Sequence, residues 1–503
     1  MYFEKNENLV NNDRNKMELA CLDTLVPKDH ILRKIDQAVD LSFIHGMTRN
    51  LYSENSGRKC IDTVILFKIV LLNFIYGNNS IRKTCEEAKV NLAYKWYLGI
   101  GLSDPVPNYS TFSQNYIRKF STTNIFEEIF SKVLEQIMNK NLIDTDIIFV
   151  DGTHIKANAN KHKSTKKKVK IITDKYHKEL ENEVNEFREI NGRDRYPSDD
   201  DDNGDGNITI DEETGEIKEK ENKNIQEITV STTDEESGMF VKGEHERQFA
   251  YVDQVACDRH GWILGYEVHP GNIHDSKAFL PFFENKLMKY EPEVCCCDAG
   301  YANAIIAHYV QENSCKLLVP YVSPKGKRTE FGKKAFEYYF EIDEYMCSNK
   351  KMLIPWNITK DGYIQYRIQK DECGNCPNKD KCIKKDAFKT VTRHLYEDCM
   401  LLAREYRLSE EGKEIYKLRK ETIERVFAEG KEYHGLRYTR YKGLKKNSNI
   451  RALLYACLNI KKLALLEKKW EKILEKKNSS SLFSSIFQTI KKLWIRISTI
   501  FLF

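Results

Sequence analysis

Residues 146–160 read DIIFVDGTHIKANAN. The β-branched and aromatic side chains at 147–150 are typical of a buried strand, and this apolar run ends at an acid, Asp151. A carboxylate next to a core is rarely left without a partner, because burying an unpaired charge is costly. This stretch therefore predicts the first strand of a sheet and the first residue of a polar site.

The sequence beyond this strand predicts a mixed α/β sheet. Two strand patterns, RQFAYVDQVACD (247–258) and WILGYEVH (262–269), are separated by a short turn and should pair as a hairpin. They are followed by a helix beginning near Asp275, the strand EVCCCD (293–298), a helix from about 302 and the strand KLLVPY (316–321). Antiparallel strands followed by strands that alternate with helices indicate an α/β fold.

Composition and periodicity divide the rest of the chain. Apolar residues at helical spacing predict a helical domain near the amino terminus, suited to DNA binding or dimerisation. The helical domain is expected at 1–140, and the first part of the α/β core at 141–321, with an acidic flexible insertion at about 195–240. A Cys-rich insertion follows at 322–410. The last part of the core is expected at 411–475, with a long amphipathic helix over about 411–430, and an amphipathic tail at 476–503 ends the sequence.

Charge is unevenly distributed along the sequence. The 503 residues carry 80 Lys and Arg against 75 Asp and Glu, a formal net charge of +5. Residues 198–236 hold 15 acidic and 3 basic residues, a net of −12, so the remainder carries +17. A basic chain favours a polyanionic partner. No apolar run reaches the roughly 20 residues that span a bilayer, and no secretory signal is recognisable, so a cytoplasmic protein with no membrane partner is expected.

Three acids at predicted element ends are candidate catalytic residues. Asp151 ends the first strand, Asp298 ends VCCCD, and Glu424 lies on the late amphipathic helix. Convergent carboxylates supply the hard oxygen ligands that Mg²⁺ or Mn²⁺ requires, and such ions support the hydrolysis of a phosphodiester. A solvated surface group is the simpler interpretation of any one of these acids.

The sequence resembles the DDE transposases of bacterial insertion sequences, specifically the IS-four superfamily and its IS-eleven-eighty-two branch. The resemblance rests on FVDGTHIKANANK, HPGNIHDS, CCDAGY and IERVFAEGKEYHGLRYTRYKGL, and on DTVILFKIVLLNFIYG and PNYSTFS in the helical region. It implies an RNase H-like fold over 146–431, with Asp151, Asp298 and Glu424 as the metal-binding triad. It also implies DNA partners, namely the terminal inverted repeats of the element and target DNA, a homodimer in the DNA complex, and nucleoid association when DNA is bound.

The superfamily motif around the glutamate is a tyrosine, an arginine, the glutamate and a lysine. Tyr416, Glu424 and Lys431 match it, whereas Lys420 stands where the arginine is expected and Arg419 lies one residue too early. Lys420 and Lys431 are therefore carried over as phosphate contacts, and Tyr416 and Arg419 are not. The basic loop that follows adds two further candidate DNA contacts, Arg437 and Arg440. For His274 and Asp275 in GNIHDS, the favoured interpretation is a turn and a helix cap.

The resemblance implies Mg²⁺-dependent cleavage at the ends of the element, followed by attack of the freed 3′-hydroxyl on target DNA. Two alternatives stay open. One is an RNase H-like nuclease that cuts without strand transfer. The other is an inactive transposase relic that only binds DNA, although all three expected acids are present.

The cysteines suggest a second metal. Cys347, Cys373, Cys376 and Cys382 give C-x25-C-x2-C-x5-C, a spacing that can form a structural, tetrahedral Zn²⁺ site and order a segment expected to lack an apolar core. An iron–sulfur cluster uses the same ligands, and unligated thiols are the other alternative. The three cysteines at 295–297 are expected to be packed thiols, because a strand alternates its side chains.

Two further segments invite functional interpretations. Residues 201–212 match the twelve-residue calcium loop of an EF-hand, but Pro197 lies just before the loop and helices are poorly supported on both sides, so a solvated linker is favoured. The tail at 476–503 could lie on a membrane surface or pack against a partner, and a dispensable extension is the alternative.

Overall fold

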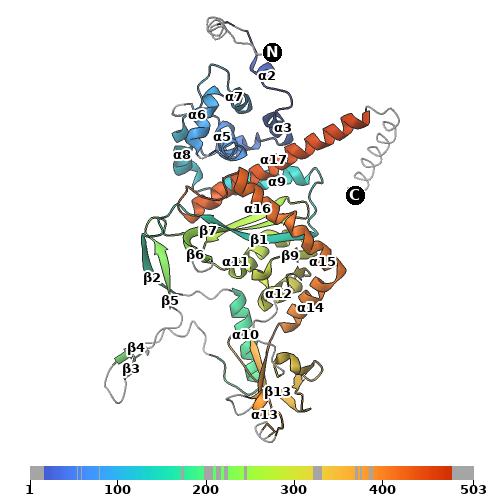
Figure 1. Ribbon diagram of the computed structural model, residues 1–503. Coiled ribbons are helices and arrows are strands. Elements are labelled where there is room, and N and C mark those ends of the chain that lie inside the picture. Colours follow the sequence, from blue (N-terminus) through green and yellow to red (C-terminus); the bar gives the residue numbers. More distant parts are fainter. Residues whose placement is uncertain are drawn as a thin grey trace, which may run out of the picture. The chain divides into compact units, whose positions relative to one another are not determined.

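Each of the two units of the chain is assembled from segments far apart in the sequence (Figure 1). A computed structural model describes residues 16–17, 19–53, 55–57, 59–78, 80–170, 175–196, 208–210, 217–219, 225–242, 246–320, 331–368, 372–373, 376–383 and 389–478. The helical unit comprises 1–143, 426–439 and 445–503, and the sheet unit comprises 144–425 and 440–444. Residues after Arg425 thus join mostly the amino-terminal helices, and not the catalytic core as expected for 411–475.

The helical unit surrounds one buried helix, α5 (Thr63–Ile75). Ten of its 13 residues are buried, which explains why its sequence is apolar on every face. Asp62 caps this helix by accepting a hydrogen bond from the backbone N–H of Val64 at 2.7 Å. The expected helical amino-terminal region is confirmed, with α2 (Leu22–Leu25), α3 (Ile31–Ala38), α4 (Phe43–Arg49), α6 (Ile81–Val90), α7 (Leu92–Leu98), α8 (Tyr109–Asn115), η1 (Tyr116–Phe120) and α9 (Ile125–Met138). The second part of α16 (Ile423–Tyr433) and most of α17 (Leu444–Asn478) complete this unit.

A buried histidine joins the three segments of the helical unit. His434 is only 2% exposed. Its Nδ1 lies 2.8 Å from the carbonyl oxygen of Phe74, and Nζ of Lys461 lies 3.2 Å from its Nε2. A carbonyl only accepts and an ammonium only donates, so the ring is neutral with its proton on Nδ1.

The central sheet of the other unit has the order β10-β9-β1-β7-β6-β5-β2, and β8 pairs with the second half of β7. The strands are β1 (Ile147–Lys156), β2 (Ser164–Lys170), β5 (Ile225–Ser231), β6 (Gly238–Lys242), β7 (Glu246–Asp258), β8 (Ile263–Pro270), β9 (Val294–Cys296) and β10 (Lys316–Leu318). β8, β7 and β1 are antiparallel neighbours, whereas β1, β9 and β10 are parallel. The expected hairpin and mixed sheet are confirmed. β1 runs on past Asp151 to Lys156, because residues 152–156 keep pairing with β7.

The helices that follow the hairpin lie where the sequence placed them. They are α11 (Asp275–Phe282), η2 (Phe283–Leu287), η3 (Met288–Tyr290), η4 (Ala299–Tyr301) and α12 (Ala304–Glu312). Phe279, Phe283 and Tyr301 are buried, and the Phe279 ring contacts both of the others. This aromatic packing fixes the loop after β9 against α11.

The acidic insertion expected at about 195–240 is only partly outside the sheet. Residues 225–231 form β5 against the lysine-rich strand β2, and 238–242 form β6 against β7. Asp234, between them, is buried and accepts hydrogen bonds from the Tyr251 hydroxyl at 2.9 Å and the Gly443 N–H at 3.1 Å. An acid of this insertion can therefore be buried when hydrogen-bond donors surround its carboxylate. Most of the calcium-loop candidate at 201–212 lies outside the described residues, as does the tail from 479 onward.

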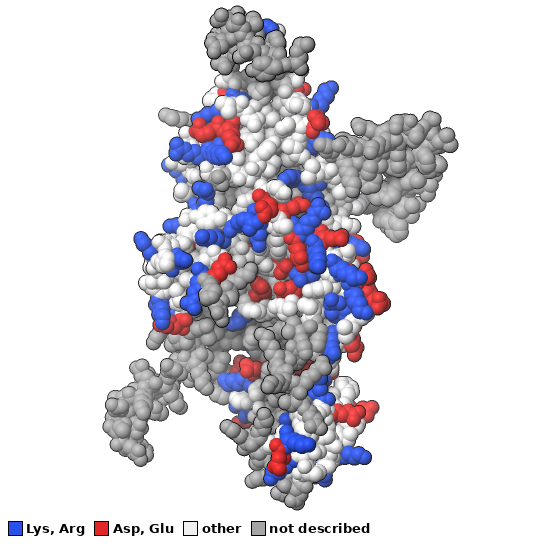
Figure 2. All heavy atoms as spheres, in the orientation of Figure 1, with Lys and Arg blue, Asp and Glu red and all other residues white. Residues whose placement is uncertain are grey.

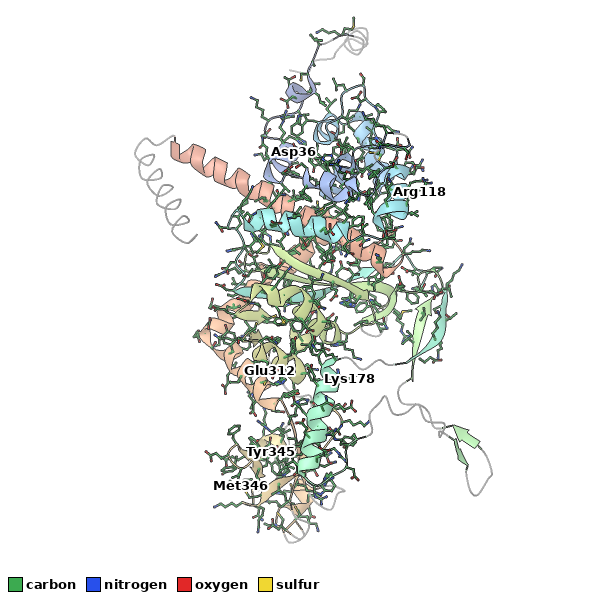
Figure 3. The ribbon with its side chains drawn as sticks, turned by 180° about the vertical axis from the view of Figure 1, so that it is seen from behind. Asp36, Arg118, Lys178, Glu312, Tyr345 and Met346 are labelled. Carbon is green, nitrogen blue, oxygen red and sulfur yellow. The ribbon has the colours of Figure 1, made fainter. Side chains whose placement is uncertain are left out.

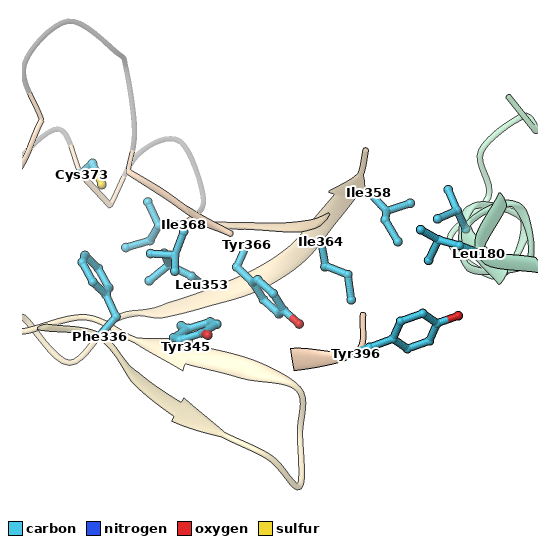
Figure 4. Packing of buried hydrophobic residues seen from close by; sticks show 12 residues of the cluster. Leu180, Phe336, Tyr345, Leu353, Ile358, Ile364, Tyr366, Ile368, Cys373 and Tyr396 are labelled. Carbon is cyan, nitrogen blue, oxygen red and sulfur yellow. The ribbon is translucent and has the colours of Figure 1, made fainter. Parts of the chain in front are cut away.

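The segment expected to be a Cys-rich insertion without a core forms a second sheet, in the order β11-β12-β13-β14-β15. Its strands are β11 (Glu337–Tyr339), β12 (Glu344–Met346), β13 (Met352–Ile358), β14 (Tyr363–Arg367) and β15 (Thr390–His394). Leu180 and Val184 of α10 (Lys175–Ile190) pack with Leu353, Tyr366 and other buried residues of this sheet (Figure 4). Tyr345 and Met346 of β12 and Lys178 of α10 are labelled in Figure 3. A segment poor in apolar core was predicted, whereas these strands and α10 bury a cluster of apolar side chains.

The long helix expected over about 411–430 is broken. α14 (Glu397–Leu408) is followed by α15 (Glu410–Lys417), the 3₁₀ turn η6 (Leu418–Lys420) and α16, which starts at Ile423. The Thr422 hydroxyl donates to the Leu418 carbonyl at 2.8 Å and supports the break. Lys420 therefore precedes the helix of Glu424 and does not share a face with it.

In the part of the chain that the structure describes, no helix has the length and apolar character needed to cross a membrane.

Acidification should destabilise the helical unit through His434. Burial, and then Lys461, lower the pKa of His434 to about 4 from the ordinary 6.5. The unfolded chain therefore takes up the proton first, and stability present above pH 6.5 is lost as the pH falls toward 4. We expect this group to contribute a loss of about 3 kcal/mol.

Urea unfolding between pH 7.5 and 4, read from hydrogen-exchange labelling of α5, measures this loss. His434→Gln should be less stable at pH 7.5 and show a flatter pH dependence. Equal pH dependence in the two proteins would contradict the assignment.

Candidate active site

Asp151 and Arg419 form a buried ion pair between β1 and the broken helix. Nη2 of Arg419 lies 2.8 Å from Oδ2 of Asp151, and the two side chains are 7% and 18% exposed. Nη1 of Arg419 also lies 3.4 Å from the Tyr416 hydroxyl. The two residues that sequence reasoning left aside, Tyr416 and Arg419, are thus the ones the structure connects to Asp151. The sequence signal for this partner was Asp151 itself, because a carboxylate at the end of an apolar strand needs a cation when it is buried.

Asp298 follows the end of β9, the strand beside β1, and lies close to Asp151. The parallel pairs end with Ile148 opposite Cys295 and Phe149 opposite Cys296, so Asp151 and Asp298 each come two residues after the last pair. The Asp298 charge is near enough to raise the pKa of Asp151. Adjacent strands are roughly 4.8 Å apart. The Asp298 carboxylate accepts a hydrogen bond from the Gly300 N–H at 2.7 Å, which fixes its direction. The structure therefore brings the two predicted aspartates together.

Asp275 adds a third carboxylate to this edge of the sheet. It begins α11, and His274 caps that helix as expected, with Nδ1 accepting from the Ser276 N–H at 3.3 Å. A Cβ added to Gly152 would lie 2.6 Å from Oδ1 of Asp275, so only glycine lets this carboxylate approach β1. Sequence reasoning assigned Asp275 to a turn and cap, although the motif GNIHDS was the available signal.

The acids perturb one another. Burial, more than any other factor, raises the pKa of Asp151 to about 6; Arg419 opposes this rise, and Asp298 and Asp275 add to it. Burial and then Asp298 raise the pKa of Asp275. Groups whose charged form is disfavoured in this way gain from a cation, because added positive charge stabilises the carboxylates.

Glu424 is exposed in the first turn of α16, five residues beyond Arg419. The chain alone keeps the two Cα atoms within roughly 18 Å. Among the described residues, no three His, Cys, Asp or Glu side chains stand close enough to hold one ion. The structure therefore assembles Asp151 and Asp298, whereas the participation of Glu424 stays a prediction.

The donor set at this edge fits a hard divalent cation. All the candidate ligands are carboxylate oxygens, the ligands that Mg²⁺ and Mn²⁺ prefer. Gln254 lies opposite Gly152 on β7, so its side chain projects on the face of the sheet opposite to that of Asp151. Its Nε2 lies 3.5 Å from the Tyr301 hydroxyl, and its buried Oε1 finds no hydrogen-bond partner among the described residues.

The four predicted phosphate contacts are divided between the two units of the chain. Lys420 and Arg440 belong to the sheet unit, and Lys431 and Arg437 belong to the helical unit. Arg437 forms an ion pair with Glu432, and the Arg440 carbonyl accepts from Asn158 Nδ2 at 3.0 Å. Figure 2 shows basic and acidic side chains interspersed over the visible face. No single basic patch is thereby identified.

The cysteines divide into two groups. Cys295, Cys296 and Cys297 are fully buried, as expected of packed thiols. Cys347, Cys373, Cys376 and Cys382 line one small cavity in the second sheet. None of the 14 cysteines, all of which lie in the described part of the chain, forms a disulfide.

Two protein-family profiles match the chain. Residues 20–118 match a family described as "Transposase domain (DUF772)", and residues 346–464 match one described as "Transposase DDE domain". The resemblance to insertion-sequence DDE transposases is thereby confirmed. A comparison with curated proteins gives no match. The second profile includes Glu424 but begins after Asp151 and Asp298, so the roles of these two acids rest on the resemblance and the geometry. The IS-eleven-eighty-two branch stays a prediction.

These transposase domains support a role in DNA transposition and an enzyme that cleaves or transfers DNA. A DDE domain implies an RNase H-like fold. The mixed sheet with its order β8-β7-β1-β9-β10 is consistent with that implication. DDE transposase domains generally use divalent metals such as Mg²⁺, in agreement with the all-oxygen donor set at the sheet edge.

Removing Arg419 should destabilise the sheet unit by leaving Asp151 buried without its cation. We expect Arg419→Met to lower the free energy of unfolding by about 3 kcal/mol at pH 8. Asp151→Asn in the same chain should restore part of this loss. At pH 5 the loss should shrink, because a carboxyl with a pKa of about 6 or higher takes up a proton there.

This double-mutant cycle is measured by urea unfolding with hydrogen-exchange labelling of β1. Arg259→Met is the matched control, since Arg259 is exposed and pairs with Asp144 at 3.4 Å. It should change stability by at most about 0.5 kcal/mol. Additive effects of the Asp151 and Arg419 substitutions would argue against the ion pair.

Proposed function

We propose that this protein is an active DDE transposase that cleaves DNA at the ends of its insertion sequence and joins the freed ends to target DNA. One observation carries the proposal. Asp151 and Asp298 each come two residues after the last pair of the parallel strands β1 and β9, and the Arg419 ion pair ties the Glu424 segment to β1. The resemblance assigns the metal-binding roles to these three acids.

The residues of the site have different roles. Asp151, Asp298 and Glu424 would hold Mg²⁺ or Mn²⁺, which when bound activates the attacking oxygen and stabilises the leaving one. Arg419 orients Asp151 and offsets part of the carboxylate charge. Asp275 faces the same site and adds negative charge there. The first attacking group is water and the second is the 3′-hydroxyl of the cut DNA, so no covalent protein nucleophile is needed.

A hollow beside this site is suited to DNA. It has a volume of about 940 Å³, and its rim includes Ala302 and Asn303, four and five residues beyond Asp298. Its lining carries the cationic residues Lys333, Lys334, Lys360, Arg393 and Arg404, together with four aromatic rings and three acids. Cations that bind phosphates and rings that stack on bases are the usual components of nucleic-acid grooves.

Other features of the proposal follow from the resemblance. Lys420, Lys431, Arg437 and Arg440 would contact phosphates. The protein would pair two element ends as a homodimer and associate with the nucleoid when bound to DNA. A nuclease without strand transfer and an inactive DNA-binding relic are the competing functions, and the experiment below separates them.

Substituting each acid should abolish DNA joining. The test uses a duplex that carries the end of the element, target DNA and Mg²⁺, with the parent chain compared against Asp151→Ala, Asp298→Ala and Glu424→Ala. We expect each rate to fall below roughly one hundredth of the parent rate, since loss of even an outer-shell partner costs 10–100-fold. Asp275→Asn should retain measurable activity with an altered Mg²⁺ requirement.

DNA binding by each variant is the control for folding. Joined products that vanish in all three variants while binding persists would support the transposase. Cleavage by the parent without joining would favour the nuclease. Binding by the parent without either reaction would leave the DNA-binding relic.

The hollow predicts a specific salt dependence. We expect Lys334→Gln with Arg404→Gln to reduce the slope of log Kd against log salt by about 2, or about 1 for each phosphate contact removed. Lys413→Gln is the matched control, since Lys413 is exposed on α15, outside the hollow, and pairs with Glu410 at 2.9 Å. Filter binding from 50 to 300 mM salt measures both. Equal slopes in all proteins would place the DNA elsewhere.

A further inference from the structure

Four cysteines from separate turns of the second sheet surround one small cavity. Cys347, Cys373, Cys376 and Cys382 all line it, and its volume is about 30 Å³. That space exceeds what one bound water needs, so it has room for a single metal ion among the four thiols. The spacing in the sequence and the lining of the cavity thus indicate the same four thiols as candidate metal ligands.

Cys347 lies in a tight turn that directs a donor at its sulfur. Its N–H donates to the Lys351 carbonyl at 2.9 Å, and the Lys350 N–H donates back to the Cys347 carbonyl at 2.9 Å. Lys350 adopts a left-handed φ of 56° to close this turn. The Lys351 N–H then lies 3.4 Å from Sγ of Cys347. A backbone N–H aimed at sulfur stabilises a thiolate, the form that binds metal.

Two consecutive turns bring the other three cysteines to the cavity. The Cys376 N–H donates to the Cys373 carbonyl at 3.4 Å, and the Lys379 N–H donates to the Cys376 carbonyl at 3.0 Å. Cys382 ends the short helix α13 (Lys379–Cys382), where its N–H donates to the Asn378 carbonyl at 2.9 Å. The local backbone therefore explains why these thiols face one space.

The surroundings of the cavity suit a charged thiolate centre. Phe336, Leu353, Ile368 and Ile383 form its apolar wall, and Figure 4 shows Cys373 near Ile368 and Phe336. Lys351, Lys379 and Lys389 also line it. One Zn²⁺ with four thiolates carries a net charge of −2, which nearby ammonium groups offset. An apolar wall excludes water from such a site.

We propose that Cys347, Cys373, Cys376 and Cys382 bind one structural Zn²⁺ that closes the turns at this end of the second sheet. Among the described residues no three candidate ligands already stand within bonding distance of one ion, so binding requires the thiols to rotate toward the cavity. Binding also releases thiol protons. The cavity adjoins the apolar core of the sheet, since Phe336, Leu353, Ile368 and Cys373 belong to both, so the metal would fasten the turns to this core.

Metal analysis of the purified full-length chain tests the site without reference to DNA. We expect about one zinc per chain, and titration of the chelated protein with Co²⁺ should give the visible bands of tetrahedral cobalt thiolate. Cys376→Ser and Cys382→Ser should lose most of the zinc and these bands. Cys399→Ser is the matched control, since Cys399 lies in the same unit, is similarly exposed and does not line the cavity. It should keep both.

Circular dichroism and DNA binding establish that each variant is folded. Removal of zinc should increase protease cleavage within 347–383 while leaving the central sheet protected. Zinc retained by Cys376→Ser and Cys382→Ser would overturn the proposal. So would iron and sulfide in place of zinc, or a parent chain that binds neither Zn²⁺ nor Co²⁺. The readout here is metal content and not activity. A protein that binds one zinc but shows no transposase activity would therefore contradict only the proposed function.

Discussion

The ion pair between Asp151 and Arg419 is the contact on which the arrangement of the candidate site depends. It joins residues 268 positions apart, and both side chains are largely buried. Either charge alone would be costly at this depth, so each requires the other. Arg419 lies within the 3₁₀ turn Leu418–Lys420 that separates α15 from α16. Glu424 consequently sits in the first turn of a new helix.

The sheet was predictable because its signals are local. The apolar run before Asp151, the hairpin and the alternation that follows all appear as short patterns, and the strands form where those patterns lie. The helix break was not predictable, since residues 418–422 contain neither glycine nor proline and the apolar periodicity continues through them. A contact distant in sequence overrides local preference there. Arg419 was set aside for this reason, because a motif compared by spacing alone assumes an unbroken helix.

The second sheet shows a different limit of sequence reasoning. The sequence predicted a Cys-rich insertion poor in apolar core, yet Tyr345 and Tyr366 are buried and their rings lie 5.0 Å apart. Tyrosine can fill a core while its hydroxyl reaches a polar partner, as that of Tyr366 does at Asp343. The matched transposase domain begins at residue 346 and continues to 464. The segment interrupting the central sheet and the helix of Glu424 are therefore covered by one domain description.

The discontinuous units have a consequence for the growing chain. Synthesis at 5–20 residues per second leaves roughly 15–50 s between the emergence of Asp151 and that of Arg419. During this interval the carboxylates at the edge of the sheet lack their cation. The helical unit is also unfinished until His434 and α17 arrive. A nascent chain shorter than about 430 residues thus has neither unit complete, so chemistry at this site waits until translation has passed the helix of Glu424.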